Sequence, residues 1–276
     1  MPVSVLILTY NEAVNIDACL RSVSWSDDVV VLDSFSTDQT VQIAEGLGTR
    51  IVQRRFDDYA SQRNFGLQQI EYRHPWVLML DADERVPADL RDEILATVAE
   101  ADADACLLRM RRRDHLFGRW IRRSSGYPTW FGRVARIGRV WAERPYNEQI
   151  KGDGNVLALE SHLDHFPFNK GFHEWISKHD RYSTLEAQIL HRTGSDPWRW
   201  RDLAASDPAR RRVALKGLIY AMPLRPLLVF NALYLLRGGL FEGRAGLTFC
   251  LLRAWYEFMI DCKYRELDRR DRGLPV

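Results

Sequence analysis

The chain has 276 residues, a formal net charge of +2 and four cysteines. This length accommodates one large α/β domain, or a domain of ordinary size with an appendage. The near balance of charge excludes nucleic-acid binding driven by net charge alone. The cysteines form neither a C-x-x-C pair nor a zinc-ligand spacing, which indicates reduced thiols in a cytosolic protein. The first residues lack the basic region and cleavage site of a signal peptide, so none is expected.

Strand and helix patterns alternate over the first hundred residues. Short β-branched and apolar runs predict strands at residues 3–8, 29–32, 51–52, 76–80 and 105–110. Apolar residues at helical spacing predict helices at residues 12–23, 58–70 and 87–101, and another from residue 36 to Gly46 or Gly48. A capping box from Ser36 to Gln39 is expected to open the second helix. This alternation predicts the α/β class, with a mostly parallel sheet flanked by helices.

Arginine and aromatic residues dominate residues 109–144, a stretch without lysine. The stretch has neither a helical nor a strand periodicity throughout, so loops and short strands over the ends of the sheet are expected there. One more strand is predicted at residues 156–159. From about residue 172 the chain becomes helical, with prolines as interruptions. No segment reaches the roughly 20 uninterrupted apolar residues that a transmembrane helix needs.

A pair of carboxylates follows the most apolar predicted strand. Asp81 and Asp83 flank Ala82 directly after the run Trp76–Leu80, which suits a central strand buried on both faces. Ligands of open α/β sheets bind beyond the carboxyl ends of the strands. Mg²⁺ is commonly held by one or two carboxylates together with substrate phosphates. The simpler alternative is an acidic turn, because aspartate is common where strands end.

Polar motifs follow other predicted strands in the same way. Thr9-Tyr10-Asn11-Glu12 follows the first strand, and Asp33 ends the second. A third motif, Gln62-Arg63-Asn64, lies on the helix predicted at residues 58–70. Structural alternatives exist: Asn11 can cap a helix, and Asp33 can begin a turn. Neither G-x-G-x-x-G nor a Walker lysine motif is present, so a dinucleotide fingerprint and a P-loop are not expected.

In order and spacing, these motifs resemble those of the family 2 glycosyltransferases, inverting enzymes of GT-A fold that use nucleotide-diphospho-sugars. The resemblance covers residues 1–110. It implies a nucleotide-sugar pocket lined by Thr9, Tyr10, Asn11, Glu12, Asp33, Arg63, Asp81 and Ala82. Within that pocket it places Asp33 at the base or ribose, Arg63 near the diphosphate and Asp81 at the ribose. It also implies that Asp83 binds the Mg²⁺ or Mn²⁺ ion that bridges the diphosphate.

Three segments narrow the resemblance to the branch that contains β-1,4-glucosyltransferases of the bacterial lipopolysaccharide inner core. They are residues 31–40, 62–67 and 80–84. The chain departs from this branch at Phe35, where glycine is usual, and at Asn147, where histidine usually precedes a glutamate.

The glutamate itself is kept as Glu148, which is therefore the expected catalytic base, with a structural salt bridge as the alternative. Asp114 and Glu143 are the reserve bases. His165 stands where the branch has a histidine near the active site, and it is expected on the acceptor side in contact with metal or phosphate.

The arginine-rich stretch suggests how an acceptor is bound. Arg111, Arg112 and Arg113 suit carboxylates and phosphates, which guanidinium groups bind in a bidentate manner, and Trp130 suits stacking on a sugar ring. A solvated basic face is the plainer alternative. Nucleic acid is not expected as a partner, because no nucleic-acid-binding motif accompanies the arginines.

The helical region suggests a lipid surface. Residues 227–236 are almost entirely apolar, and Arg225, Arg237 and Arg244 flank them. Such a piece can lie in a membrane interface beside anionic lipid, or it can pack on the rest of the protein. Peripheral association with the cytoplasmic face of the inner membrane is the expectation.

The resemblance implies a GT-A catalytic domain at residues 1–170, with its nucleotide-sugar part at 1–110 and its acceptor part at 111–170, and the sequence pattern predicts a helical region at 171–276. The resemblance also implies the activity, which is inverting, metal-dependent transfer of a sugar, glucose from UDP-glucose, to a lipopolysaccharide core or related glycolipid. A polyprenyl-phosphate or other cell-envelope glycosyltransferase is the alternative. Two further alternatives are a phosphatase of the haloacid dehalogenase type and a non-catalytic carbohydrate-binding protein. The phosphatase motif has Thr or Val at the position of Arg85.

Overall fold

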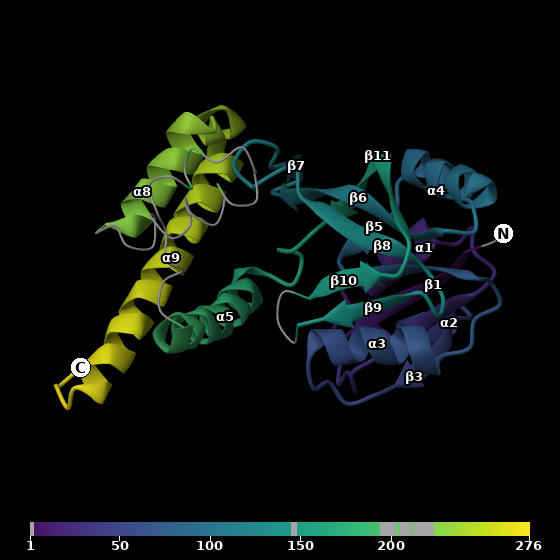
Figure 1. The fold of residues 1–276 in the computed structure, drawn as a ribbon, viewed down its shortest axis with the longest axis horizontal. Coiled ribbons are helices and arrows are strands. Elements are labelled where there is room, and N and C mark those ends of the chain that lie inside the picture. Colours follow the sequence, from purple (N-terminus) through teal and green to yellow (C-terminus); the bar gives the residue numbers. More distant parts are fainter. Residues whose placement is uncertain (1–2, 145–147, 194–201, 203, 205–210, 212–223) are drawn as a thin grey trace. The chain divides into compact units, whose positions relative to one another are not determined.

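The computed structural model of the protein describes residues 3–144, 148–193, 202, 204, 211 and 224–276. The chain forms two compact units (Figure 1). The first unit consists of residues 1–120 and 126–170, and the second of residues 121–125 and 171–276. A short piece of the arginine-rich stretch therefore belongs to the second unit.

In the described part of the first unit, nine strands form one sheet. Strands β3, β2, β1 and β4 are parallel neighbours in that order; β8 runs antiparallel to β4 and β6, and β11 runs parallel to β6. Short strands β5 and β7 pair with β11 and β6. The strands are β1 (Val3–Thr9), β2 (Val29–Asp33), β3 (Arg50–Gln53), β4 (Trp76–Asp81), β5 (Glu84–Arg85), β6 (Ala105–Leu116), β7 (Arg119–Trp120), β8 (Trp130–Arg136) and β11 (Asn155–His165). A separate antiparallel ribbon joins β9 (Val140–Glu143) to β10 (Gln149–Gly152).

Helices cover both faces of this sheet, as Figure 1 shows. They are α1 (Ile16–Ser22), α2 (Thr40–Gly46), α3 (Tyr59–Gln69) and α4 (Ala88–Glu100). In β4, Leu78 and Leu80 face the apolar cluster that includes α1 and α4, whereas Val77 and Met79 face the cluster that includes α3. Each such fully buried side chain contributes roughly 1.5–3 kcal/mol. The predicted α/β class, with a mostly parallel sheet, is confirmed.

Two local predictions about the first unit are wrong. Strand β6 does not end near residue 110 but continues to Leu116, because β11 and β8 pair with its arginine-rich half. The expected capping box does not form either. Helix α2 begins only at Thr40, and the Ser36 hydroxyl instead donates a hydrogen bond to the Asp33 carboxylate.

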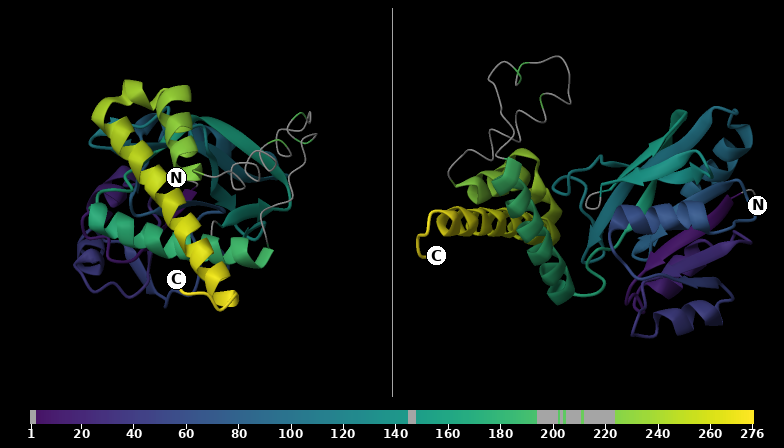
Figure 2. Two further views of the ribbon diagram at one scale, coloured as in Figure 1. Left: turned by 90° about the vertical axis from the view of Figure 1, so that its left-hand side faces the viewer. Right: turned by 60° about the horizontal axis from the view of Figure 1, so that its bottom comes forward.

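The described part of the second unit is helical. It contains α5 (Phe172–Thr193), α8 (Arg225–Asn231), the π-helical turn η1 (Ala232–Leu236), the 3-10 turn η2 (Gly239–Glu242) and α9 (Gly243–Asp271). The long helix α9 packs against both α8 and α5, and it crosses α5 (Figure 2). Among the described residues, no helix combines the length and apolar character required to cross a membrane.

Candidate functional site

The carboxyl ends of three neighbouring strands bring the predicted motifs together. In the sheet register, Thr9 of β1 pairs with Asp33 of β2, and Leu8 pairs with Asp81 of β4. Parallel strands end at the same edge of a sheet, so motifs far apart in the sequence meet there. This edge is where ligands of such sheets bind.

Asp33 organises the loop that follows β2. Its side chain is fully buried, and its carboxylate accepts hydrogen bonds from Thr9 Oγ1 at 3.0 Å, the Ser36 backbone N–H at 2.9 Å and Gln53 Nε2 at 3.2 Å. These contacts hold the loop in place. A direct contact of Asp33 with a base or ribose stays a prediction.

The loop after β1 is fixed from both sides. Asn11 has a left-handed backbone with φ of 53°, and its Oδ1 accepts the Thr37 backbone N–H at 2.8 Å. Asn11 therefore does not cap α1, which begins only at Ile16. Tyr10 is exposed beside it.

Glu12, in the same loop, lies close to Asp83. Its carboxylate accepts hydrogen bonds from Asn15 Nδ2 at 2.9 Å and Lys170 Nζ at 3.2 Å. Burial and, second, the charge of Asp83 raise the pKa of Glu12 above its usual value. A cation between Glu12 and Asp83 would relieve this repulsion.

Asp81 is held between two buried arginines. Its Oδ1 accepts a hydrogen bond from Arg63 at 2.8 Å, and its Oδ2 accepts one from Arg133 at 2.9 Å. Only 1% of the Arg63 side chain and 5% of the Arg133 side chain are exposed, against 37% of Asp81. Carboxylate oxygens accept more than one hydrogen bond, so Asp81 can still receive a ribose hydroxyl.

Glu84 lies behind this arrangement. It is fully buried, its Oε2 accepts the Asp81 backbone N–H at 3.0 Å, and its Oε1 accepts a hydrogen bond from Arg133. Burial raises the pKa of Glu84, and the charge of Arg133 opposes that rise. Glu84 and Arg133 thus fix the backbone and the side chain of Asp81.

Neither Glu84 nor Arg133 was expected from the sequence as a site residue. Glu84 directly follows Asp81-Ala82-Asp83, the Asp-x-Asp motif, and this proximity is the signal that could have identified it. Nothing in the sequence distinguishes Arg133 from the many arginines around it.

The three residues of the Gln62-Arg63-Asn64 motif reach three different partners from α3. Gln62 donates to Ser34 Oγ at 3.2 Å. Arg63 bridges Asp81 and Glu148, with its Nε 2.9 Å from the Glu148 carboxylate. Asn64 exchanges two hydrogen bonds with the Ala142 backbone in β9. The motif therefore fastens the site to its surroundings.

Glu148, the expected base, lies in this network with one-fifth of its side chain exposed. Its neighbours Tyr146 and Asn147 lie outside the described residues. Of the two reserve candidates for the base, Asp114 is hydrogen-bonded to His165. Glu143 instead accepts a hydrogen bond from the Trp141 indole N–H within β9. The structure thus joins Glu148, and not Glu143, to Asp81 through one arginine.

His165 stands between two aspartates. Its Nε2 lies 3.4 Å from Asp83 Oδ2, and its Nδ1 lies 2.7 Å from Asp114 Oδ1. Burial and the charge of Arg112 lower the pKa of His165, but Asp83 and Asp114 outweigh them and raise it to about 9. Asp83 also accepts the Phe166 N–H through its backbone carbonyl at 2.8 Å, which fastens β11 to the Asp-x-Asp loop.

These donors suit a divalent cation. The Asp83 carboxylate and the His165 imidazole face each other, and Glu12 lies nearby. A bound cation would displace the proton of His165, because only the neutral imidazole is a metal ligand. Among the described residues, no group of three or more such side chains is arranged to hold a metal by itself. A partial set of this kind fits Mg²⁺ or Mn²⁺, because such ions take further ligands from water and substrate phosphates.

The arginines expected on the acceptor side are paired within the protein. Arg111 pairs with Glu160 at 3.0 Å, Arg112 with Asp114 at 3.1 Å and Arg113 with Asp164 at 2.6 Å. The guanidinium groups of Arg109 and Arg111 lie over the Trp130 ring, 5.1 and 5.2 Å from its centroid. An acceptor anion would share or exchange these partners, and acceptor binding here stays a prediction.

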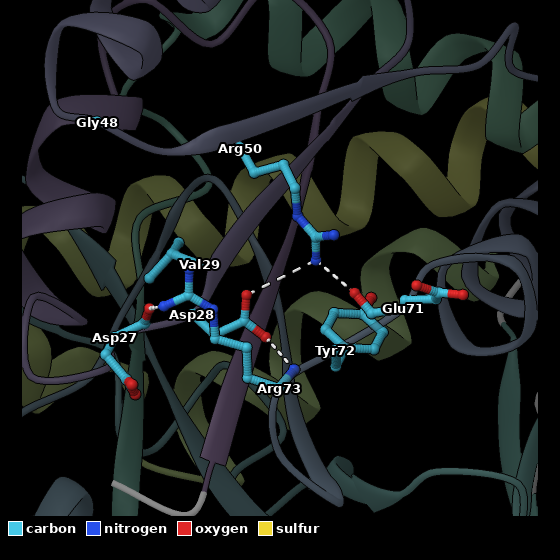
Figure 3. Close-up of a pocket in the computed structure, with 8 residues that line it drawn as sticks. All are labelled: Asp27, Asp28, Val29, Gly48, Arg50, Glu71, Tyr72 and Arg73. Carbon is cyan, nitrogen blue, oxygen red and sulfur yellow. Dashed lines mark hydrogen bonds and ion pairs between the residues drawn. The ribbon is translucent and has the colours of Figure 1, made fainter.

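A pocket at the opposite edge of the sheet has a different character. Its volume is about 320 Å³, and it lies where β2 and β3 begin. Figure 3 shows the residues that line it. Arg50 lies 3.6 Å from the Asp28 carboxylate, which also accepts the Arg73 backbone N–H at 2.8 Å and the Ser4 hydroxyl at 2.6 Å. These contacts join the starts of three strands and their loops, and we assign them a structural role.

Comparison with known proteins identifies the chain. The family model described as glycosyl transferase family 2 matches residues 4–164, more than half of its length. The chain belongs to glycosyl transferase family 2. This membership confirms an enzyme of the glycosyltransferase class, and it excludes a haloacid dehalogenase phosphatase and a non-catalytic carbohydrate-binding protein.

Two relatives show the range of this similarity. The lipopolysaccharide core biosynthesis glycosyltransferase LpsC of Rhizobium meliloti is 30% identical over 218 residues, which cover 71% of this chain and 74% of LpsC. An uncharacterized glycosyltransferase of Rickettsia bellii is 28% identical over 207 residues, covering 71% of this chain and 69% of that protein.

Two solved structures match the chain at lower sequence identity. TarS residues 1–349 from S. aureus has a TM-score of 0.44 and 19% identity, covering 99% of this chain and 92% of that chain. Glucosyl-3-phosphoglycerate synthase from Mycobacterium tuberculosis, in complex with Mn²⁺, UDP and glucosyl-3-phosphoglycerate, has a TM-score of 0.35 and 22% identity, covering 40% of this chain and 44% of that chain.

Proposed function

We propose that this glycosyltransferase transfers glucose from UDP-glucose, with inversion at the anomeric carbon, to a lipid-linked saccharide of the lipopolysaccharide core. One observation carries the proposal: the buried Arg63 pairs with both Asp81 of the Asp-x-Asp motif and Glu148. In this proposal the donor pocket and the base therefore lie at one site, and direct displacement needs a base that can reach the acceptor hydroxyl beside the bound donor.

In this proposal the donor lies along the carboxyl edge of β1, β2 and β4. Thr9 to Glu12 and Asp33 shape the nucleotide pocket together with Ala82, Asp81 binds the ribose, and Arg63 lies near the diphosphate. Asp83 and His165 would hold Mg²⁺ or Mn²⁺. When bound, the cation would offset the charge that develops on the leaving diphosphate.

Glu148 acts as the base. Its carboxylate takes the proton of the acceptor hydroxyl while that oxygen bonds to the anomeric carbon. The bond between the anomeric carbon and the diphosphate oxygen breaks in the same step, and UDP leaves with the electron pair. Arg63 contacts Glu148 throughout and keeps its carboxylate in position.

The acceptor assignment draws on the LpsC similarity and on the charge of β6. LpsC is by its name a lipopolysaccharide core glycosyltransferase. An acceptor of that type bears carboxylates and phosphates, which suit Arg111, Arg112, Arg113 and the adjoining Trp130. A lipid-linked acceptor also places the enzyme at the cytoplasmic face of the inner membrane, as a peripheral protein.

A donor and acceptor assay tests this function. The purified protein is offered a panel of nucleotide-sugars with Mn²⁺, and release of the nucleoside diphosphate is measured with and without truncated lipopolysaccharide. We expect UDP release from UDP-glucose and a product heavier by one hexose. Use of a different nucleotide-sugar would contradict the donor, and no gain of mass on any truncated core would contradict the acceptor.

A further inference from the structure

The second unit exposes an apolar tip where α8 turns back into α9. This hairpin tip comprises residues 235–244, and it includes η2 and the end of η1. Leu236 is 86% exposed and Phe241 is 67% exposed, and Leu235 and Leu240 are exposed beside them. Large apolar side chains held this far into solvent are unusual, and a cluster of them marks a contact surface.

The tip is well defined because its glycines pack closely. Gly238 and Gly243 have positive φ values of 79° and 61°, which turn the chain twice within a few residues. A side chain on Gly246 would collide with the Gly239 carbonyl. Leu236 and Phe241 are therefore held outward by the turn.

Among residues 224–260, which the structure describes, the exposed charged side chains are all positive. Between residues 224 and 260 the sequence has only two carboxylates, Glu242 and Glu257. Both are buried, with 6% and 7% of their surface exposed.

Each of these carboxylates is turned inward by its own partners. Glu242 accepts the Arg123 N–H at 2.7 Å and the Ser124 N–H at 3.1 Å. Glu257 pairs with Arg225 at 3.0 Å. The negative charges of the hairpin are thus withdrawn from its surface.

Positive charges remain at the surface of the tip. Arg123, Arg237 and Arg244 are exposed, and the Arg123 guanidinium lies 5.1 Å from the centroid of the Phe241 ring. Apolar side chains at the centre with arginines around them match the acyl boundary and the phosphate layer of a bilayer. A second copy of the chain would not supply the complementary negative charge from the same surface.

We propose that the hairpin tip inserts Leu236 and Phe241 into an anionic membrane surface, with Arg123, Arg237 and Arg244 against lipid phosphates. The inference deepens the proposed function and depends on it only for the lipid-linked acceptor. Binding to vesicles is measurable without donor or acceptor, so the two proposals fail separately.

Vesicle co-sedimentation with the full chain tests the tip. The probes are vesicles of phosphatidylcholine alone and of phosphatidylcholine mixed with phosphatidylglycerol. We expect binding to the mixed vesicles only, falling by about five-fold for Arg244→Glu and by at least about ten-fold for the double variant Leu236→Asp/Phe241→Asp. The double variant Leu274→Asp/Val276→Asp is the matched control, because both residues are exposed at the C-terminus of the same unit, and it should bind like the wild type.

Circular dichroism and melting temperatures show whether each variant is folded. Equal binding to both vesicle types, no binding by the wild type, or full binding by the tip variant would each overturn the proposal. A wild-type dimer that Leu236→Asp/Phe241→Asp dissociates, with no vesicle binding, would instead assign the tip to a second copy of the chain.

Discussion

The two units differ in whether their charged side chains are paired with each other or exposed to solvent. At the site of the first unit, the carboxylates of Asp81, Glu84 and Glu148 are paired with two buried arginines, Arg63 and Arg133. At the tip of the second unit, Glu242 is buried and arginines stay outside with exposed leucine and phenylalanine. Buried pairs fix the positions of individual atoms, which catalysis needs. An exposed surface of one sign suits an extended partner of opposite charge.

The largest expected effect tests the site of the first unit. Asp83→Asn removes the carboxylate that faces His165, and we expect a loss of transfer of roughly a thousand-fold because metal-assisted stabilisation of the leaving group is worth several kcal/mol. The control is Asp153→Asn, since Asp153 is an exposed partner of Arg139. Steady-state transfer rates and melting curves are measured for both variants. A transfer rate of Asp83→Asn within ten-fold of the wild type would show that Asp83 is not part of the catalytic site.

A second substitution separates chemistry from donor binding. Glu148→Gln keeps the size of the side chain and removes its basicity, so kcat should fall by about 10²–10⁴. UDP binding should remain close to that of the wild type, because the Asp-x-Asp loop is intact. A reduced affinity for UDP with an unchanged kcat would show that Glu148 only supports Arg63.

Breaking the buried pairs should cost stability as well as activity. Arg133→Met leaves Glu84 buried without its main cationic partner, and we expect a loss of about 3–5 kcal/mol in the free energy of unfolding. The exposed Arg109 has its contact with Trp130, and Arg109→Met should cost under about 1 kcal/mol. Denaturant titration measures both.

A double variant checks that the pair itself matters. Because Glu84→Gln removes the stranded charge, Glu84→Gln/Arg133→Met should lose less stability than the two single losses together. Additive losses would mean that the two side chains act separately.

The smallest effect concerns the second unit and acid. His179 stacks on Trp175 with ring centroids 3.6 Å apart, and burial lowers its pKa to about 4. In the unfolded chain the histidine pKa is about 6.5. The neutral His179 ring therefore contributes its full share to the free energy of unfolding above about pH 6.5, and this contribution is lost as the pH falls toward 4. We expect about 2 kcal/mol of acid destabilisation, which His179→Gln should remove.

The exposed His173 on the same helix provides the control. His173→Gln should leave the pH dependence unchanged, as measured by urea unfolding at several pH values. A flat profile in the wild type would show that His179 is freely protonated in the folded state.

The sequence predicted the parts of the site that depend on local pattern. The buried run of β4 and the Asp-x-Asp that follows it are contiguous in the chain, and the order of the other motifs placed them at one edge of the sheet. Partners that come from distant strands were not predictable in this way. Arg133 reaches Asp81 across 52 residues, and His165 reaches Asp114 across 51.

Competition for hydrogen bonds explains the local errors. Ser36 has the spacing of a helix cap, but the buried Asp33 carboxylate accepts its hydroxyl. The arginines of β6 look like a loop in the sequence, yet Asp164 and Glu160 of β11 neutralise two of them and allow a continuous strand.

Calorimetric titration of UDP, with and without Mn²⁺, tests the central claim most directly. The claim is that Asp83 and its neighbours hold a cation that binds the donor diphosphate. We expect Mn²⁺ to raise the affinity of the wild type for UDP by at least about ten-fold and to have no such effect on Asp83→Asn. Equal UDP affinity with and without Mn²⁺ in the wild type would contradict the account.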